Sequence, residues 1–220
     1  MKKFLAALAV LALSGTVANA ATFDFSYYGN SNYGTSFSYM QDGINLTLTP
    51  STFNQNNGNT YTDSNDRLGR WSNGIGVRNS SNDHHYVDGS NGNDMVIFSF
   101  DTEVTIKSVT LQRYGSDDDF AFYFDATGDG DFNDAADWRD NEVDPVGWNN
   151  PSIYTFQQIW SGLTFGIGAE GYYDGFKIKS VTVDPTLSVV PLPAALPLYG
   201  AGVAVLGFMG WRRKKQAAKA

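Results

Sequence analysis

Apolar and polar residues alternate in several short segments in the middle of the chain. Apolar side chains occupy every second position in Phe23–Tyr27 and in Ile44–Leu48, and phenylalanine does so in Phe120–Phe124. Because successive side chains of a β-strand point to opposite faces of the sheet, this alternation predicts half-buried strands. Further apolar runs predict strands at Met95–Phe100, Val104–Leu111, Leu163–Ile167 and Phe176–Val183.

Polar segments rich in Asn, Asp, Ser and Gly separate most of these runs. The clearest are Asn30–Gly34, Asn54–Asn65 and Asn79–Asn93. Such residues favour turns because they tolerate the backbone conformations that tight turns need. The helical spacing of three to four residues is almost absent from the middle of the chain. The pattern therefore predicts an all-β fold, an antiparallel β-sandwich of jelly-roll type.

One five-residue sequence, Ile-Lys-Ser-Val-Thr, occurs twice, at Ile106–Thr110 and at Ile178–Thr182. Within each copy Ile and Val are three positions apart, which places them on opposite faces of a regular strand. A β-bulge between them would bring both to the same face. We therefore predict bends at Lys107–Ser108 and at Lys179–Ser180. The alternative is a coincidence between two ordinary strands.

The amino-terminal end has the pattern of a secretion signal. Lys2 and Lys3 precede the apolar run Phe4–Leu13, and small residues follow up to Ala20. This order is typical of a cleavable signal peptide, so the mature chain is expected to begin at Ala21.

The carboxy-terminal end has the pattern of a membrane span. Ala194–Trp211 is almost wholly apolar, and as a helix of roughly 18 residues it would be about 27 Å long, close to the hydrocarbon thickness of about 30 Å. The cluster that follows would stay on the cytoplasmic side as a stop-transfer signal. Its members are Arg212, Arg213, Lys214 and Lys215. The sequence thus predicts a signal peptide (1–20), a β-domain (21–187) and a tail (188–220).

A proline-containing box precedes this span, and its residues are Val190, Pro191, Leu192, Pro193 and Ala194. Together with the Gly-containing apolar segment and the basic cluster, it resembles the VPLPA-CTERM variant of the PEP-CTERM protein-sorting signal. The resemblance implies a Gram-negative exosortase substrate. Signal peptidase would cleave the exported precursor, which the inner membrane would hold until exosortase processes it near the prolines. The product would reach the cell surface or the extracellular matrix. The segments Gly74–Val77 and Asn93–Phe100 also look like those of other PEP-CTERM proteins, whose domains are similar to carbohydrate-binding jelly rolls.

The charge of the predicted β-domain is strongly negative. It contains all 23 acidic residues of the 220-residue chain but only eight of the 15 basic ones, so its formal charge is 8 − 23 = −15. Such a surface repels nucleic acid and anionic lipid and suits divalent cations or neutral sugars. The chain has no cysteine, so disulfides do not stabilise it.

The segment Asp125–Asp134 follows the start of a calcium-binding loop. Oxygen-bearing side chains occupy loop positions 1, 3, 5 and 9, glycine occupies position 6 and an apolar residue occupies position 8. Position 12 departs from the pattern, because Ala136 stands there and an aspartate follows one residue later. Asp134 or an acid of Asp117–Asp119 could complete the shell instead. The alternative is a solvated acidic turn. The predicted Ca²⁺ ligands are Asp125, Thr127, Asp129, Asp131, Asn133 and Asp137.

Aromatic residues in polar, loop-like segments are candidates for stacking on sugar rings. Such stacking uses the apolar face of the sugar, while amides or carboxylates bind its hydroxyls. Each candidate could instead cap the core. The candidates are Trp71, Trp138 and Trp148, with Tyr86, Tyr172 and Tyr173 in similar segments.

Catalytic patterns are weak in this chain. His84 and His85 are the only histidines, and adjacent residues cannot readily act as base and orienting partner for each other. No serine lies in a nucleophile elbow. The three glutamates, Glu103, Glu142 and Glu170, neither support nor exclude glycoside hydrolysis. We therefore expect a non-catalytic exported protein associated with exopolysaccharide or biofilm. The alternatives are a carbohydrate-binding module and, third, a polysaccharide hydrolase.

Overall fold

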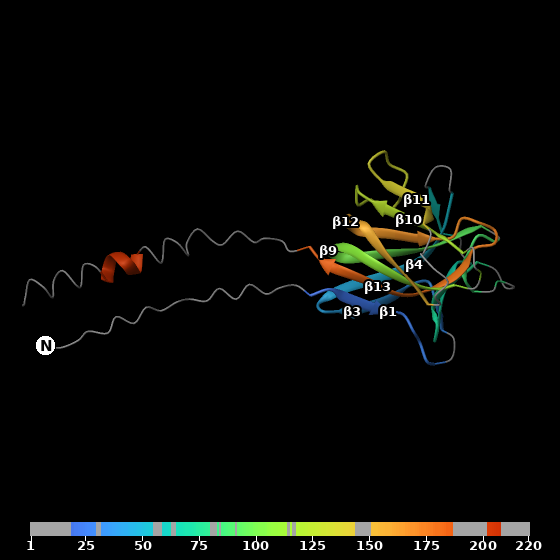
Figure 1. Ribbon diagram of the computed structural model, residues 1–220, viewed down its shortest axis with the longest axis horizontal. Helices are drawn as coiled ribbons and strands as arrows, with labels where there is room; N and C mark the ends of the chain where they lie inside the picture. Colours follow the sequence, from blue (N-terminus) through green and yellow to red (C-terminus); the bar gives the residue numbers. More distant parts are fainter. Residues whose placement is uncertain are drawn as a thin grey trace, which may run out of the picture. The chain divides into compact units, whose positions relative to one another are not determined.

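The computed structural model describes residues 19–29, 32–54, 59–62, 65–79, 83, 85–90, 92–113, 115, 118–143, 151–186 and 202–207, with only the backbone of 141 and 142. The described residues form an antiparallel sheet of 13 strands (Figure 1). The strands are β1 (Ala21–Asp24), β2 (Asn32–Gly34), β3 (Phe37–Gln41), β4 (Ile44–Phe53), β5 (Thr60–Tyr61), β6 (Arg67–Trp71), β7 (Gly74–Arg78), β8 (Val87–Asp88), β9 (Asn93–Arg113), β10 (Phe120–Asp125), β11 (Trp138–Val143), β12 (Ser152–Gly168) and β13 (Gly175–Pro185).

The long strand β9 organises this sheet because its two parts have different neighbours. The part up to Phe100 pairs with β4, and the part from Val104 pairs with β13. β12 pairs with both parts along the other edge of β9. The path of hydrogen-bonded neighbours runs β11-β10-β12-β9-β13-β7-β6-β2, with β4 and β1 attached to it through β9 and β13.

A single large hydrophobic core joins the two halves of the sheet. Phe23 in β1 lies 5.8 Å from Phe100 between ring centroids, and Phe25 lies 6.0 Å from Phe98. β1 pairs with β13, so these contacts hold the half of the sheet that contains β13 over the first part of β9. The sheet therefore folds over on itself and buries one side of both halves.

The repeated sequence lies where β9 and β13 pair, and the two copies pair with each other. Val109 is opposite Val181, and the register shifts at Lys107 in one copy and at Lys179 in the other. Each shift inserts the extra residue that brings Ile and Val to the same buried face. The predicted bends are confirmed. Two antiparallel strands are related by an approximate twofold axis, so the same five residues take the same pattern of bulge and buried side chains in both strands.

The predicted all-β, antiparallel class is confirmed for the described residues, and several details differ. Met95–Phe100 and Val104–Leu111 belong to one strand, β9, because β12 pairs along both. The three polar segments predicted as turns contain the short strands β2, β5 and β8. The strands form one continuous sheet, whereas a sandwich was expected to have two.

The chain divides after Thr186 into two units, Met1–Thr186 and Leu187–Ala220. The described part of the second unit is a short helix at 202–207. Within the described residues, no helix has the length and apolar character needed to span a membrane. The sorting box, the stop-transfer cluster, most of the predicted span and all but the last two residues of the predicted signal peptide lie outside the described residues.

We predict that the chain truncated to 21–186 folds by itself. Its core consists of residues of the first unit only, and its first strand β1 pairs with its last strand β13. Circular dichroism should show a β-type spectrum and one cooperative thermal transition. A truncated chain that remained unfolded would mean that residues after 186 contribute to the core.

Candidate functional site

The predicted calcium loop lies between β10 and β11, and a buried carboxylate organises its start. Asp125 ends β10 with 2% of its surface exposed. Its Oδ2 accepts a hydrogen bond from Gly130 N at 2.9 Å, and its Oδ1 accepts one from Thr127 Oγ1 at 3.3 Å. Gly130 has a φ of 95°, which glycine adopts without strain. Asp125 therefore fixes the turn from inside.

Two further acids of this loop, Asp129 and Asp137, accept hydrogen bonds from backbone amides close to them. Asp129 Oδ1 accepts a hydrogen bond from Asp131 N at 3.2 Å. Asp137 joins the two ends of the loop, because its oxygens accept hydrogen bonds from Ala126 N and Asp134 N, both at 2.9 Å. Asp137 therefore helps to hold the loop together, whereas the contact of Asp129 is local and exposed.

A phenylalanine anchors the loop to the sheet. Phe132, at position 8, is buried and its ring centroid lies 5.5 Å from that of Tyr123. Both belong to a small hydrophobic cluster separate from the main core. The described residues contain no group of three or more His, Cys, Asp or Glu side chains that could hold a metal ion. The Ca²⁺ site therefore stays a prediction, as does its alternative, a solvated acidic turn.

We predict that millimolar Ca²⁺ raises the melting temperature of the protein if the loop binds it. At a hundredfold excess over the dissociation constant, binding would add about 2.7 kcal/mol to the free energy of unfolding. Asp129→Ala should abolish the rise and leave the melting temperature in chelator nearly unchanged, because Asp129 is exposed. Glu103→Ala, which removes an exposed acid from β9, is the matched control. Equal melting with Ca²⁺ and with chelator would leave only the solvated turn.

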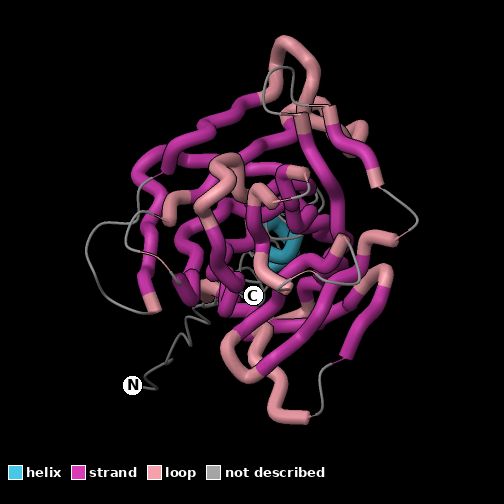
Figure 2. Tube along the Cα trace, turned by 90° about the vertical axis from the view of Figure 1, so that its right-hand side faces the viewer, coloured by secondary structure: helices cyan, strands magenta, loops and turns pink. Residues whose placement is uncertain are grey.

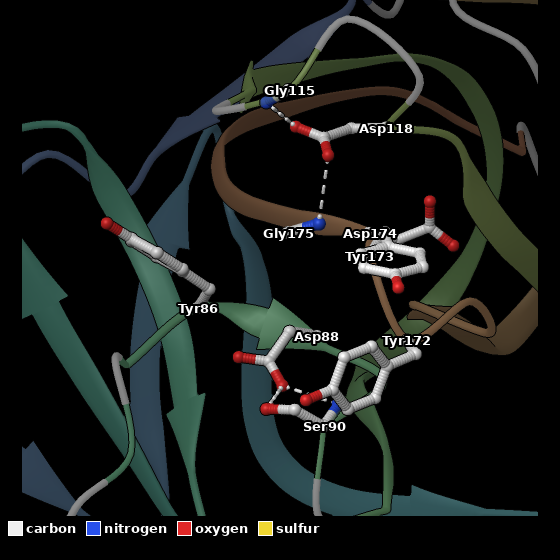
Figure 3. Close-up of a pocket in the computed structure, with 9 residues that line it drawn as sticks. All are labelled: Tyr86, Asp88, Ser90, Gly115, Asp118, Tyr172, Tyr173, Asp174 and Gly175. Atoms are coloured by element: carbon white, nitrogen blue, oxygen red, sulfur yellow. Dashed lines mark hydrogen bonds between the residues drawn. The ribbon is translucent and has the colours of Figure 1, made fainter.

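A pocket of about 370 Å³ lies where three separate segments of the β-domain meet (Figure 3). Its size is at the small end of the roughly 300–1,000 Å³ typical of small-molecule sites. Its walls come from β8 and its flanks, the β9–β10 connection and the turn before β13. The lining residues are Tyr86, Asp88, Ser90, Gly115, Asp118, Tyr172, Tyr173, Asp174 and Gly175.

One carboxylate holds two of these segments together. Asp118 is 1% exposed, and its Oδ1 accepts a hydrogen bond from Gly175 N at 3.2 Å. Its Oδ2 accepts a second from Gly115 N, so that Asp118 links the β9–β10 connection to the start of β13 (Figure 3). Asp118 therefore both shapes the pocket and lines it.

The other two carboxylates of the pocket are also held by neighbouring groups. Asp88 Oδ1 accepts hydrogen bonds from Ser90 N at 2.8 Å and from Ser90 Oγ at 2.6 Å. Asp174 Oδ2 accepts one from Gly171 N at 2.6 Å. Burial raises the pKa of Asp174 above its usual value, and the charge of Asp118 adds to the effect. The hydrogen bonds from Gly171 and Asp119 oppose this rise.

Two exposed tyrosines stand at the edge of the pocket. Tyr172 and Tyr173 are 72% and 83% exposed, and their rings meet at 89° with 5.2 Å between centroids. The ring faces of tyrosine are apolar and suit the C–H faces of sugars. The carboxylates beside them can accept hydrogen bonds from hydroxyl groups. The pocket thus combines both kinds of group that sugar binding requires.

The structure places two of the three tryptophans predicted to stack on sugars, Trp71 and Trp138, in different surroundings. Trp71 packs flat against His85, with 5.4 Å between ring centroids, and Lys177 Nζ lies 4.6 Å from its ring. It supports a buried lysine whose pKa burial lowers to about 8, despite the opposing charge of Asp83. Trp138 borders a second cavity on β11. Trp148 lies outside the described residues, as do His84 and the side chain of Glu142.

Sequence reasoning found the tyrosines of the pocket but missed most of its acids. Asp118 belongs to the acidic run Asp117–Asp119, which the sequence suggested only as the source of a calcium ligand. Asp88 and Ser90 lie in a segment predicted as a turn. The adjacency of Tyr172, Tyr173 and Asp174 was the one local signal for this pocket.

The comparisons with known proteins identify no relative. No protein-family model, no curated protein and no solved structure matches this chain. Its function must therefore be argued from its own residues.

A buried acid lies beside Asp88, which lines the pocket. Asp94 is fully buried, and its oxygens accept hydrogen bonds from Asn79 Nδ2 at 3.1 Å and Asp88 N at 3.4 Å. Burial raises its pKa well above the usual value, and the charges of Asp88, Asp83 and Asp66 add to the rise, while the hydrogen bond from Asp88 N opposes it. The folded state therefore favours the protonated carboxyl.

We predict that the free energy of unfolding falls as the pH rises from 5 to 8. A raised folded pKa of Asp94 gives stability that is complete below the unfolded pKa of about 3.9 and is lost as the pH rises through the folded value. Asp94→Asn should reduce this fall. Glu103→Gln removes an exposed charge and controls for general repulsion. Urea unfolding at both pH values is the measurement, and an Asp94→Asn protein with an unchanged pH dependence would contradict the assignment.

Proposed function

We propose that this chain is an exported, non-catalytic protein of the cell surface or exopolysaccharide matrix, and that its β-domain binds a neutral polysaccharide. The observation that carries the proposal is the pocket in Figure 3, where Tyr172 and Tyr173 stand beside three carboxylates. Ring faces would contact the apolar face of a sugar, and carboxylates would bind its hydroxyls.

Charge favours a neutral ligand over an anionic one. The segment 21–187 carries a formal charge of −15, and the lining of the pocket includes Asp88, Asp118 and Asp174 but no lysine or arginine. An anionic polysaccharide would meet repulsion at long range and at the pocket. A neutral sugar polymer meets neither.

Export and sorting are supported by the two ends of the sequence. The proposal includes cleavage by signal peptidase, insertion of the tail in the inner membrane and processing by exosortase near Pro191 and Pro193. The proposal also includes a distant relationship between the β-domain and jelly-roll domains. Nucleic acid is not a partner in this proposal, because the acidic domain would repel it.

The same pocket gives a second candidate function, a polysaccharide hydrolase. A glycosidase needs a carboxyl of raised pKa as general acid and a second, ionised carboxylate. Asp174 has the raised pKa, and Asp118 lines the same pocket as the second carboxyl group. Against this candidate, both oxygens of Asp118 accept backbone hydrogen bonds, which suits a structural carboxylate. Release of new reducing ends from a polysaccharide, lost in Asp174→Asn, would favour the hydrolase.

We predict that Tyr172→Ala/Tyr173→Ala weakens binding to neutral polysaccharides by tenfold or more, which corresponds to about 1.4 kcal/mol. Both rings are exposed, so the melting temperature should change little. Affinity electrophoresis against dextran, xylan, galactomannan and β-glucan is the measurement. Tyr28→Ala, at an equally exposed tyrosine outside the pocket, should bind as the unmodified protein does. If the unmodified protein binds none of a broad panel of neutral polysaccharides, the proposed function is wrong.

A further inference from the structure

A second cavity, of about 190 Å³, lies on the surface formed by β10, β11 and β12. It shares no lining residue with the pocket in Figure 3, which we call the tyrosine pocket. We call it the aromatic groove and define it by Trp138, Asp140, Phe156, Gln157, Gln158 and Trp160, which are among its lining residues. β11 pairs only with β10 among the described strands, so this groove lies at one edge of the sheet.

An irregularity in β12 creates the groove. Thr155 pairs with Ser108 and Trp160 pairs with Ile106, so four residues of β12 face a single residue of β9. This large bulge turns Gln157 and Gln158 toward solvent while Phe156 and Trp160 stay half-buried. Two amide side chains are thereby placed between two aromatic ones.

Aromatic contacts make the base of the groove rigid. Trp138 stacks on Trp160, with 5.1 Å between ring centroids and 29° between the planes. Phe156 packs against Phe122, with 4.5 Å between their ring centroids. Trp138 remains 44% exposed, so part of its indole is available to a ligand. A preorganised aromatic surface loses little conformational entropy when it binds.

The polar groups at this surface match hydroxyl groups rather than charges. Gln157 and Gln158 can each donate and accept hydrogen bonds, and Asp140 can accept them. All three are exposed. The groove lining includes one acid and no lysine or arginine, which disfavours an anionic ligand. An indole face flanked by amides and a carboxylate suits a neutral sugar ring.

We propose that the aromatic groove is a second sugar-binding site, which contacts the same neutral polysaccharide as the tyrosine pocket. This inference rests on the proposed function and extends it, because it makes the domain bivalent. When one polymer reaches both sites, the second contact forms at high effective concentration. A short oligosaccharide occupies one site at a time and gains nothing from this effect.

The test compares a long neutral polysaccharide with a short oligosaccharide of the same sugar, using the full-length protein and calorimetry. Trp138→Ala should weaken binding of the polymer by at least tenfold, since avidity gains are roughly 10² to 10⁴. Binding of the oligosaccharide to the tyrosine pocket should persist. Adding Tyr172→Ala/Tyr173→Ala should remove the remaining binding.

Two further variants separate ligand contact from structural damage. Gln157→Ala/Gln158→Ala leaves the aromatic stack in place and should also weaken polymer binding. Ile159→Ala is the matched control, because Ile159 is 77% exposed on the same bulge and does not line the groove. It should bind as the unmodified protein does.

The outcomes distinguish this inference from the function on which it rests. Unchanged polymer binding in both the Trp138 and the glutamine variants, with loss in the tyrosine variant, would overturn the groove and leave the tyrosine pocket as the single site. Loss in the groove variants with no effect of the tyrosine variant would support the groove and refute the pocket. A protein that binds no neutral polysaccharide would refute both.

Discussion

The pairing of β9 with two different partners along one edge is the constraint on which the rest of the structure depends. Its first part needs β4 and its second part needs β13, and the change occurs at the exposed residues Asp101–Glu103. Asp101 stabilises the point of change, because it accepts hydrogen bonds from the backbone and side-chain nitrogens of Asn45, at 2.9 and 2.6 Å. Once the neighbours differ, the two halves of the sheet can face each other and bury a common core.

The same constraint explains the bulges and the position of the candidate sites. A strand that belongs to both halves cannot keep a regular register along its whole length, and extra residues are inserted both in β9 and in its partners β12 and β13. Where β9 and β13 pair, the inserted lysines, Lys107 in β9 and Lys179 in β13, keep the core side chains on one face. At β12 the larger insertion exposes the glutamines of the aromatic groove. The irregularity that closes the core thus also shapes a surface.

The β-domain has distinct ends. Ala21 pairs with Val183, so its first strand starts beside the end of its last one, Pro185. The tyrosine pocket includes Gly175, at the opposite end of β13, and Figure 2 looks onto the end where connecting loops project. An 11-residue strand at about 3.3 Å per residue separates the two ends of β13 by roughly 35 Å. A ligand in the pocket would therefore bind far from the point where the chain continues into the tail segment.

The sequence by itself determined the features that depend on near neighbours. Alternation of apolar residues gave strands such as β10, and the three-residue spacing of Ile106 and Val109 required the bulge that the structure contains. The loop after Asp125 was also visible, because turn residues act locally. Tertiary structure alone decided the convergence of Tyr172 with Asp118, and the stacking of Trp138 on Trp160. These residues lie far apart in the chain, and the pairing of several strands brings them together, which no local period encodes.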